Sequence, residues 1–110
     1  MTSIHDRYAE TGTMVLCRDA PDSAPKRGAE TAAHFAYIEA HLEEIYVAGP
    51  LFAPDGATVV GSLFVYRTKS AARARALLEG DPYFRAGVYA TTEVLPFLPA
   101  AGRYLGGKIW

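Results

Sequence analysis

The feature that most constrains this chain is the order of its apolar segments. Residues 13–18, 46–52, 58–67 and 88–96 have the composition of strands, and residues 29–46 and 71–79 have the spacing of amphipathic helices. Their order is strand, helix, strand, strand, helix, strand. This order predicts an α+β fold of the ferredoxin-like βαββαβ type, in which two helices cover one face of a four-stranded antiparallel sheet.

Turn and cap residues separate these segments. Residues 19–27 contain two prolines and are expected to form a loop, and residues 54–57 have the Pro-Asp-Gly order of a hairpin turn. Ser70 is expected to cap the second helix, and Asp81-Pro82 is expected to begin a short helical turn. We therefore expect one domain over residues 13–98, between an N-terminal arm (1–12) and a C-terminal tail (99–110).

The first helix should pack on the sheet through one apolar stripe. Phe35, Ile38, Leu42 and Ile45 recur at offsets of three and four residues. At about 100° per residue, His34 lies at the edge of this stripe. The sequence therefore places an imidazole at the rim of the buried face.

The strand at residues 58–67 is apolar on both sides. Val59, Leu63 and Val65 should face one way, and Val60, Phe64 and Tyr66 the other. Because the two helices cover only one face, we expect Val60, Phe64 and Tyr66 on the open face, where a second copy of the chain would cover them. The sequence thus predicts a homodimer, and Leu105, Ile109 and Trp110 of the tail are candidates for contacts with the partner.

Composition excludes several classes of protein. The 110 residues carry a formal net charge of −1, without the clustered basic excess of a nucleic-acid binder. The single cysteine, Cys17, excludes an internal disulfide framework, and its place in an apolar strand predicts an inert core thiol. No apolar run has the ~20 residues of a membrane span or the pattern of a signal peptide. We expect a cytoplasmic protein with neither nucleic acid nor membrane as a partner.

Three polar side chains stand at positions where apolar residues are expected. These are His34, Asp81 just beyond the second helix, and Ser62 in the third strand. A carboxylate beside an imidazole fixes its tautomer and strengthens it as a general base, so His34 and Asp81 are candidates for a catalytic dyad. The alternatives are that Asp81 is only a helix cap, that His34 is a satisfied boundary residue and that Ser62 only makes room for a neighbour.

Other residues suggest a binding pocket rather than a metal site. Phe64, Tyr66, Tyr83, Tyr89 and Phe97 are candidates for an apolar pocket, although aromatic residues of small domains often form the core. His41 follows His34 by two helical turns, and we expect it beside the same site. The spacing of these histidines lacks the pattern of a zinc site, so we expect neither a metal nor another cofactor.

Taken together, these segments resemble the YciI-like (YCII-related) family. The resemblance rests on the order of several short motifs that follow the helix bearing His34: Ala48-Gly-Pro-Leu51, Asp55-Gly56, Gly61-Ser62, Ala71-Ala72, Asp81-Pro-Tyr83, Ala86-Gly-Val88 and Leu95-Pro-Phe97. It implies a dimeric α+β barrel with an active site centred on His34 and Asp81. Members of the family often carry an arginine shortly before the histidine. Here Thr31 stands one turn ahead, and Arg27 a further turn back.

The residues and the resemblance lead to one functional hypothesis and one rival. The hypothesis is a cofactor-independent acid/base enzyme, a lyase or isomerase similar to a dehydrochlorinase, acting on a small aromatic or quinoid molecule. His34 would move the proton, Asp81 would orient His34, and Ser62, Phe64, Tyr83 and His41 would bind substrate. The rival is a non-catalytic small-molecule-binding or assembly module, in which His34 and Asp81 brace helix ends.

Overall fold

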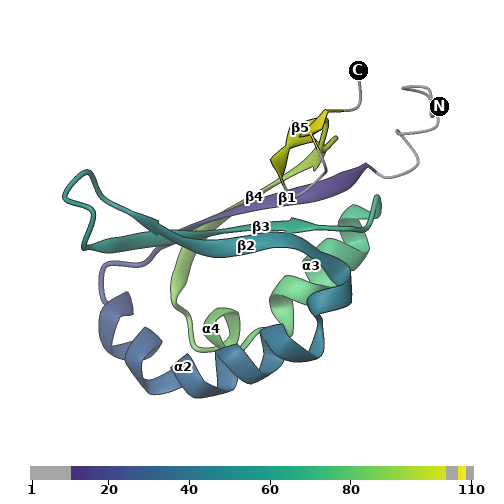
Figure 1. Cartoon of the computed structure of the whole chain (residues 1–110). Coiled ribbons are helices and arrows are strands. Elements are labelled where there is room, and N and C mark those ends of the chain that lie inside the picture. The colour runs from purple at the N-terminus through teal and green to yellow at the C-terminus, as the bar shows by residue number, and fades with distance from the viewer. Residues whose placement is uncertain (1–10, 104–106, 109–110) are drawn as a thin grey trace.

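The computed structural model describes residues 11–103 and 107–108, and its centre is a four-stranded antiparallel sheet of order β2-β3-β1-β4. The strands are β1 (Gly12–Asp19), β2 (Ile45–Phe52), β3 (Val59–Tyr66) and β4 (Tyr89–Phe97). Helices α2 (Ser23–Ala40), α3 (Ala71–Glu79) and α4 (Pro82–Arg85) all lie on one face of it, as Figure 1 shows. The predicted ferredoxin-like α+β fold is therefore confirmed.

Helix α2 differs from the prediction at both ends. It begins at Ser23 rather than residue 29, so the prediction of a loop over residues 19–27 is wrong. Pro25 fits in the first turn because the first amides of a helix have no intrahelical acceptor, and a missing N–H there costs little. The helix ends at Ala40, and residues 42–44 form a 3-10 turn, η2 (Leu42–Glu44), that leads into β2. The earlier start places Arg27 on the helix.

The second half of the helical layer follows its cap residues. Helix α3 spans the predicted residues 71–79, and the Ser70 side chain accepts a hydrogen bond from the Arg73 amide. Helix α4 is capped by Asp81, whose side chain accepts from the Tyr83 amide. Gly87 ends this turn at φ 78°, a conformation that side chains disfavour. The caps fix where Asp81 enters the layer between helices and sheet.

The core lies between the helices and the face of β3 that carries Phe64 and Tyr66. Both side chains are 2% exposed and pack with Val15 and Leu77, so the expectation that they lie on the open face is wrong. The helices cover the face with the larger aromatic area because its burial removes more apolar surface from water. A register shift between Leu51 and Phe52 of β2 also breaks the alternation along β3.

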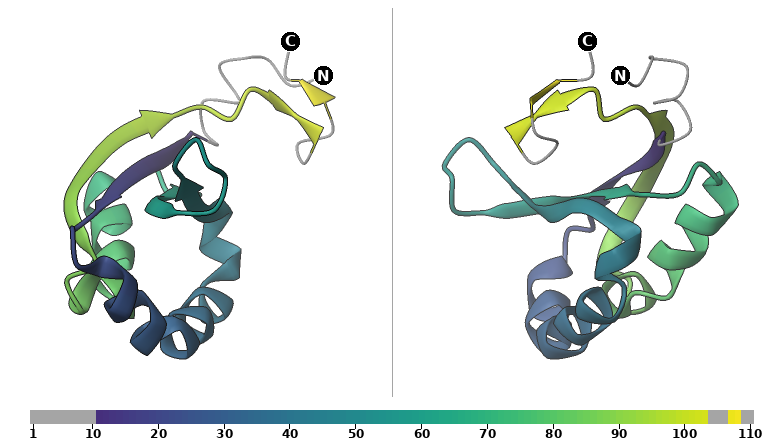
Figure 2. Two further views of the ribbon diagram at one scale, coloured as in Figure 1. Left: turned by 90° about the vertical axis from the view of Figure 1, so that its left-hand side faces the viewer. Right: turned by 45° about the vertical axis from the view of Figure 1, so that its right-hand side comes forward.

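The opposite face of the sheet is apolar and partly covered by the chain itself. Val47, Leu95 and Phe97 are 51%, 48% and 43% exposed. A two-stranded ribbon, β5 (Ala101–Gly102) with β6 (Gly107–Lys108), lies on this side of the sheet (Figure 2). The expected contacts of Leu105, Ile109 and Trp110 lie outside the described residues, as do residues 1–10 of the expected arm.

Candidate functional site

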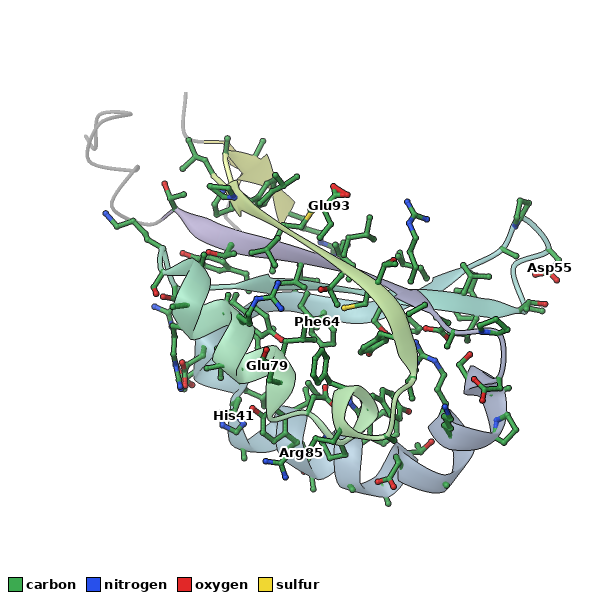
Figure 3. The ribbon with its side chains drawn as sticks, turned by 180° about the vertical axis from the view of Figure 1, so that it is seen from behind. His41, Asp55, Phe64, Glu79, Arg85 and Glu93 are labelled. Carbon is green, nitrogen blue, oxygen red and sulfur yellow. The ribbon has the colours of Figure 1, made fainter. Side chains whose placement is uncertain are left out.

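A cavity of about 440 Å³ lies between helix α2, the turn at α4 and strands β2 and β3. Its lining combines a mainly apolar wall with three polar side chains, Arg27, His34 and Ser62; the other lining residues are Phe35, Ile38, Ala48, Gly49, Pro50, Val59, Phe64 and Tyr83. Figure 3 shows Phe64 in the layer between the sheet and the helices. An apolar hollow with few convergent polar groups is typical of a small-molecule site.

His34 and Asp81 meet at this cavity although they are 47 residues apart. The His34 Nδ1–H donates to Asp81 Oδ1 at 2.8 Å, and the side chains are 12% and 1% exposed. Because Nδ1 is committed to the carboxylate, Nε2 is the ring nitrogen left for a ligand. Among the described residues, Nε2 has no hydrogen-bond partner. This arrangement fixes one tautomer, as acid/base chemistry by a histidine requires.

Asp81 has a structural role at the same time. Its Oδ1 accepts both from His34 and, at 2.9 Å, from the Tyr83 amide at the start of α4. Its Oδ2 is buried and has no hydrogen-bond partner within the described part of the chain. The helix-cap interpretation and the dyad interpretation therefore describe the same carboxylate.

The ring of Tyr83 packs against the face of the His34 imidazole. The rings of His34 and Tyr83 are stacked, with centroids 3.9 Å apart and planes inclined by 10°. The Tyr83 hydroxyl lies 3.3 Å from Thr31 Oγ1, and the Arg27 guanidinium lies 5.0 Å from the Tyr83 ring centre. The ring is thus fixed on both α2 and α4, which limits the orientations open to His34.

Arg27 is the cation of the cavity. Its guanidinium donates to both carboxylate oxygens of Asp19, at 2.7 and 2.8 Å, and its Nη2 donates to the Gly61 carbonyl and to Ser62 Oγ at 3.1 and 2.9 Å. Burial disfavours the charge, but the hydrogen bond and attraction to Asp19 outweigh it and raise the pKa of Arg27. Arg27 therefore stays protonated; it lines the cavity, whereas its partner Asp19 does not.

Ser62 lies at the junction of this network with strand β4. Its hydroxyl oxygen accepts from Arg27 and, at 2.9 Å, from the Tyr89 hydroxyl. Burial raises the pKa of Tyr89, so this phenol remains a donor at ordinary pH. Ser62 is only 4% exposed, and it lines the cavity.

The predicted site residues are distributed unequally. His34, Ser62, Phe64 and Tyr83 line the cavity, and Asp81 lies directly behind His34. His41 does not: its Nδ1–H donates to the Tyr37 carbonyl at 2.7 Å, and Figure 3 shows it away from Phe64. Helix α2 ends at Ala40, so His41 does not continue the helical face that presents His34 to the cavity.

Two residues of helix α2 differ from the sequence-based prediction. Arg27 is helical rather than part of a loop, and the signal for this is that the first turn of a helix tolerates proline. Phe35 was expected in the core but is 58% exposed at the cavity, and Leu42, also 58% exposed, lies beyond the helix end. Ile38 and Ile45 of the predicted stripe do pack against the core.

The remaining chemistry-bearing groups lie apart from the cavity or form no cluster. Over residues 11–103 and 107–108, no group of three or more His, Cys, Asp or Glu side chains is arranged to hold a metal ion. Cys17 is fully buried beside Ser62, its cross-strand neighbour, and burial raises the pKa of its thiol to about 12. No helix among the described residues has the length and apolar character needed to cross a membrane.

The sequence model of the YCII-related domain matches residues 11–98, which include helices α2 and α4 and strands β2 and β3 around the cavity. The chain belongs to the YCII-related domain family. Protein YciI from Escherichia coli O6:H1 is 33% identical over 91 residues, covering 76% of this chain and 93% of that protein, and Protein YciI from Shigella flexneri has the same values.

A solved structure of an enzyme shares the fold. It is the 5-chloro-2-hydroxyhydroquinone dehydrochlorinase TftG from Burkholderia phenoliruptrix AC1100, in complex with 2,5-dihydroxybenzoquinone. It superimposes with a TM-score of 0.70 at 28% identity, covering 84% of this chain and 97% of that one. The YCII-related chain described here is thus similar in fold to a protein that acts on a small ring compound.

Proposed function

We propose that this YCII-related protein is a cofactor-independent acid/base enzyme, a lyase or isomerase, that acts on a small aromatic or quinoid molecule. The observation that carries the proposal is the imidazole of His34 at an apolar cavity, with Nδ1 held by a buried carboxylate and Nε2 unpaired among the described residues. The likeness to TftG supports the choice of substrate class.

The proposed reaction needs no external oxidant or reductant. Nε2 of His34 takes a proton from a hydroxyl group or a saturated ring carbon, and the electron pair left behind moves into the conjugated ring system. A vinylic ring C–H exchanges by the same step after the deuterated Nε2 has added a deuteron to its carbon. In an isomerisation the proton returns at another atom, and in an elimination the leaving group departs with its bonding pair. Asp81 stabilises the imidazolium that forms in between, and one such positioned acid/base group contributes about 10²–10⁴-fold in rate.

A proton-exchange assay tests this proposal. The purified protein is incubated in D2O with 2,5-dihydroxybenzoquinone, and the loss of the ring C–H signal is followed by NMR. We expect exchange above the protein-free rate, and a loss of about 10²–10⁴-fold in His34→Ala. His41→Ala is the matched control, because it removes a histidine of the same helix region that does not line the cavity. If the quinone binds without exchanging, or does not bind, the proposal is wrong.

The rival function is a non-catalytic small-molecule-binding or assembly module. The observation that favours it is the second bond of Asp81, which caps helix α4 through the Tyr83 amide. In that case the pair would serve stability alone. Exchange at the same rate in His34→Ala and in the wild type would support this rival.

We also propose that the protein is a homodimer formed through the open face of the sheet. The exposed apolar side chains there, Val47, Leu95 and Phe97, form the kind of surface that a soluble chain usually covers with another chain. The cavity lies on the opposite, helix-covered side, so this contact leaves it accessible.

A further inference from the structure

Ser62 is a hydroxyl whose acceptor capacity is already used. A serine oxygen has two lone pairs and one hydrogen. Here one lone pair accepts from Arg27 Nη2 and the other from the Tyr89 hydroxyl, both at 2.9 Å. A guanidinium has no acceptor, and the geometry of the bond to Tyr89 makes the phenol the donor. Ser62 can therefore act toward anything else only as a donor.

The hydrogen of Ser62 has no protein acceptor within the described residues. The side chain is 4% exposed, and the space it adjoins is the cavity. A buried hydroxyl hydrogen without an acceptor is costly, so native proteins usually pair it with a ligand or water. Within the described part of the chain, the hydroxyl hydrogen of Ser62 is thus available to an acceptor bound in the cavity.

The charge beside Ser62 determines the kind of acceptor. Arg27 and Asp19 form an ion pair, but of these two only Arg27 lines the cavity, so the positive end of the pair faces the ligand. Accepting a bond from a guanidinium also polarises the Ser62 O–H and makes it a stronger donor. The partner that fits is an oxygen carrying negative charge.

We propose that Ser62 binds a negatively charged ring oxygen of the substrate through its hydroxyl hydrogen, with Arg27 and Tyr89 as positioning residues that hold the hydroxyl in this direction. The inference rests on the proposed function, which it deepens by naming the substrate as an enolate or phenolate. Ser62 binds the oxygen at which charge accumulates while His34 moves the proton. The substrate is then held by two polar groups of different roles in an otherwise apolar hollow.

Binding of 2,5-dihydroxybenzoquinone tests the inference separately from proton transfer. The dissociation constant is measured by titration calorimetry, and exchange per bound ligand is measured in the same samples. Removing a hydrogen bond to a charged oxygen should weaken binding about 10- to 100-fold in Ser62→Ala. Thr13→Val is the matched control: it removes a buried hydroxyl that bonds to the Thr68 carbonyl, so binding should be unchanged.

The outcomes separate the two proposals. Ser62-dependent binding without any exchange supports the oxygen site while the acid/base function fails. If Ser62→Ala binds as the wild type does, or if only Arg27→Met loses affinity, the assignment to Ser62 is wrong. Should Ser62→Ala not fold, Ser62→Cys is used, because a thiol fills the same place as a much weaker donor; an unchanged dissociation constant there also refutes the inference.

Discussion

Replacing Asp81 by asparagine separates its electrostatic role from its structural one. Asparagine keeps an oxygen for the His34 Nδ1–H and the Tyr83 amide, and its NH2 group takes the place of Oδ2, which already lacks a partner. Asparagine and aspartate are nearly equal as helix caps. We therefore expect the free energy of unfolding of Asp81→Asn to lie within about 1 kcal/mol of the wild type.

The same substitution should slow proton transfer strongly. Nδ1 of His34 and Oδ1 of Asp81 are 2.8 Å apart. The charges of an imidazolium and a carboxylate are each spread over several atoms, so we take about 4 Å between their centres, which gives an attraction of about 4 kcal/mol at an effective dielectric constant of about 20. Asp81→Asn loses this stabilisation of the imidazolium but keeps the hydrogen bond. In the quinone exchange assay we expect kcat/KM to fall by roughly 10²–10³-fold, most of it in kcat.

Asp81→Ala should behave differently in stability. It removes the cap, at a cost of about 0.5–2 kcal/mol, and leaves the His34 N–H without its acceptor, at about 1–3 kcal/mol. Ser70→Ala is the control, because it removes the cap of α3 away from the cavity and should lower stability without lowering the exchange rate. Urea unfolding measures these differences. A folded Asp81→Asn with the wild-type exchange rate would refute the proposed role of the pair.

Three further predictions concern the core, the sheet and its open face. Cys17 should react slowly with a thiol reagent at pH 8 until the protein unfolds. Folding raises the pKa of its thiol from 9.0 to about 12, so its contribution to the free energy of unfolding is present below pH 9 and is lost between pH 9 and 12. Between pH 9 and 12 the free energy of unfolding of Cys17→Ala should fall less steeply than that of the wild type. Rapid reaction of Cys17 in the native protein would contradict this prediction. Gly61→Ala should lower the free energy of unfolding by about 1–3 kcal/mol or more, because its Cβ would overlap the Cys17 carbonyl oxygen, whereas Gly49→Ala meets no atom and should change it little. Leu95→Glu should turn the proposed dimer into a monomer in sedimentation, whereas Leu42→Glu, at an exposed position outside the sheet, should not; a monomeric wild type would contradict the dimer.

Local patterns were sufficient for the order of the elements and for several of their ends. Helix α3 starts and stops at the predicted residues because Ser70 and Gly80 act on their own neighbours. The turn before α4 follows from Asp81 and Pro82 in the same way. Such signals need no distant partner, so a sequence alone contains them.

Long-range contacts determined the composition of the cavity. The sequence indicated the chemical types of His34, Asp81 and Ser62, but the distance between segments 47 residues apart depends on how α2 and α4 pack on the sheet. Arg27 reaches Ser62 only because α2 begins at Ser23. The covered face of β3 was also decided by the tertiary structure, because this strand is apolar on both faces and only the packed helices distinguish them.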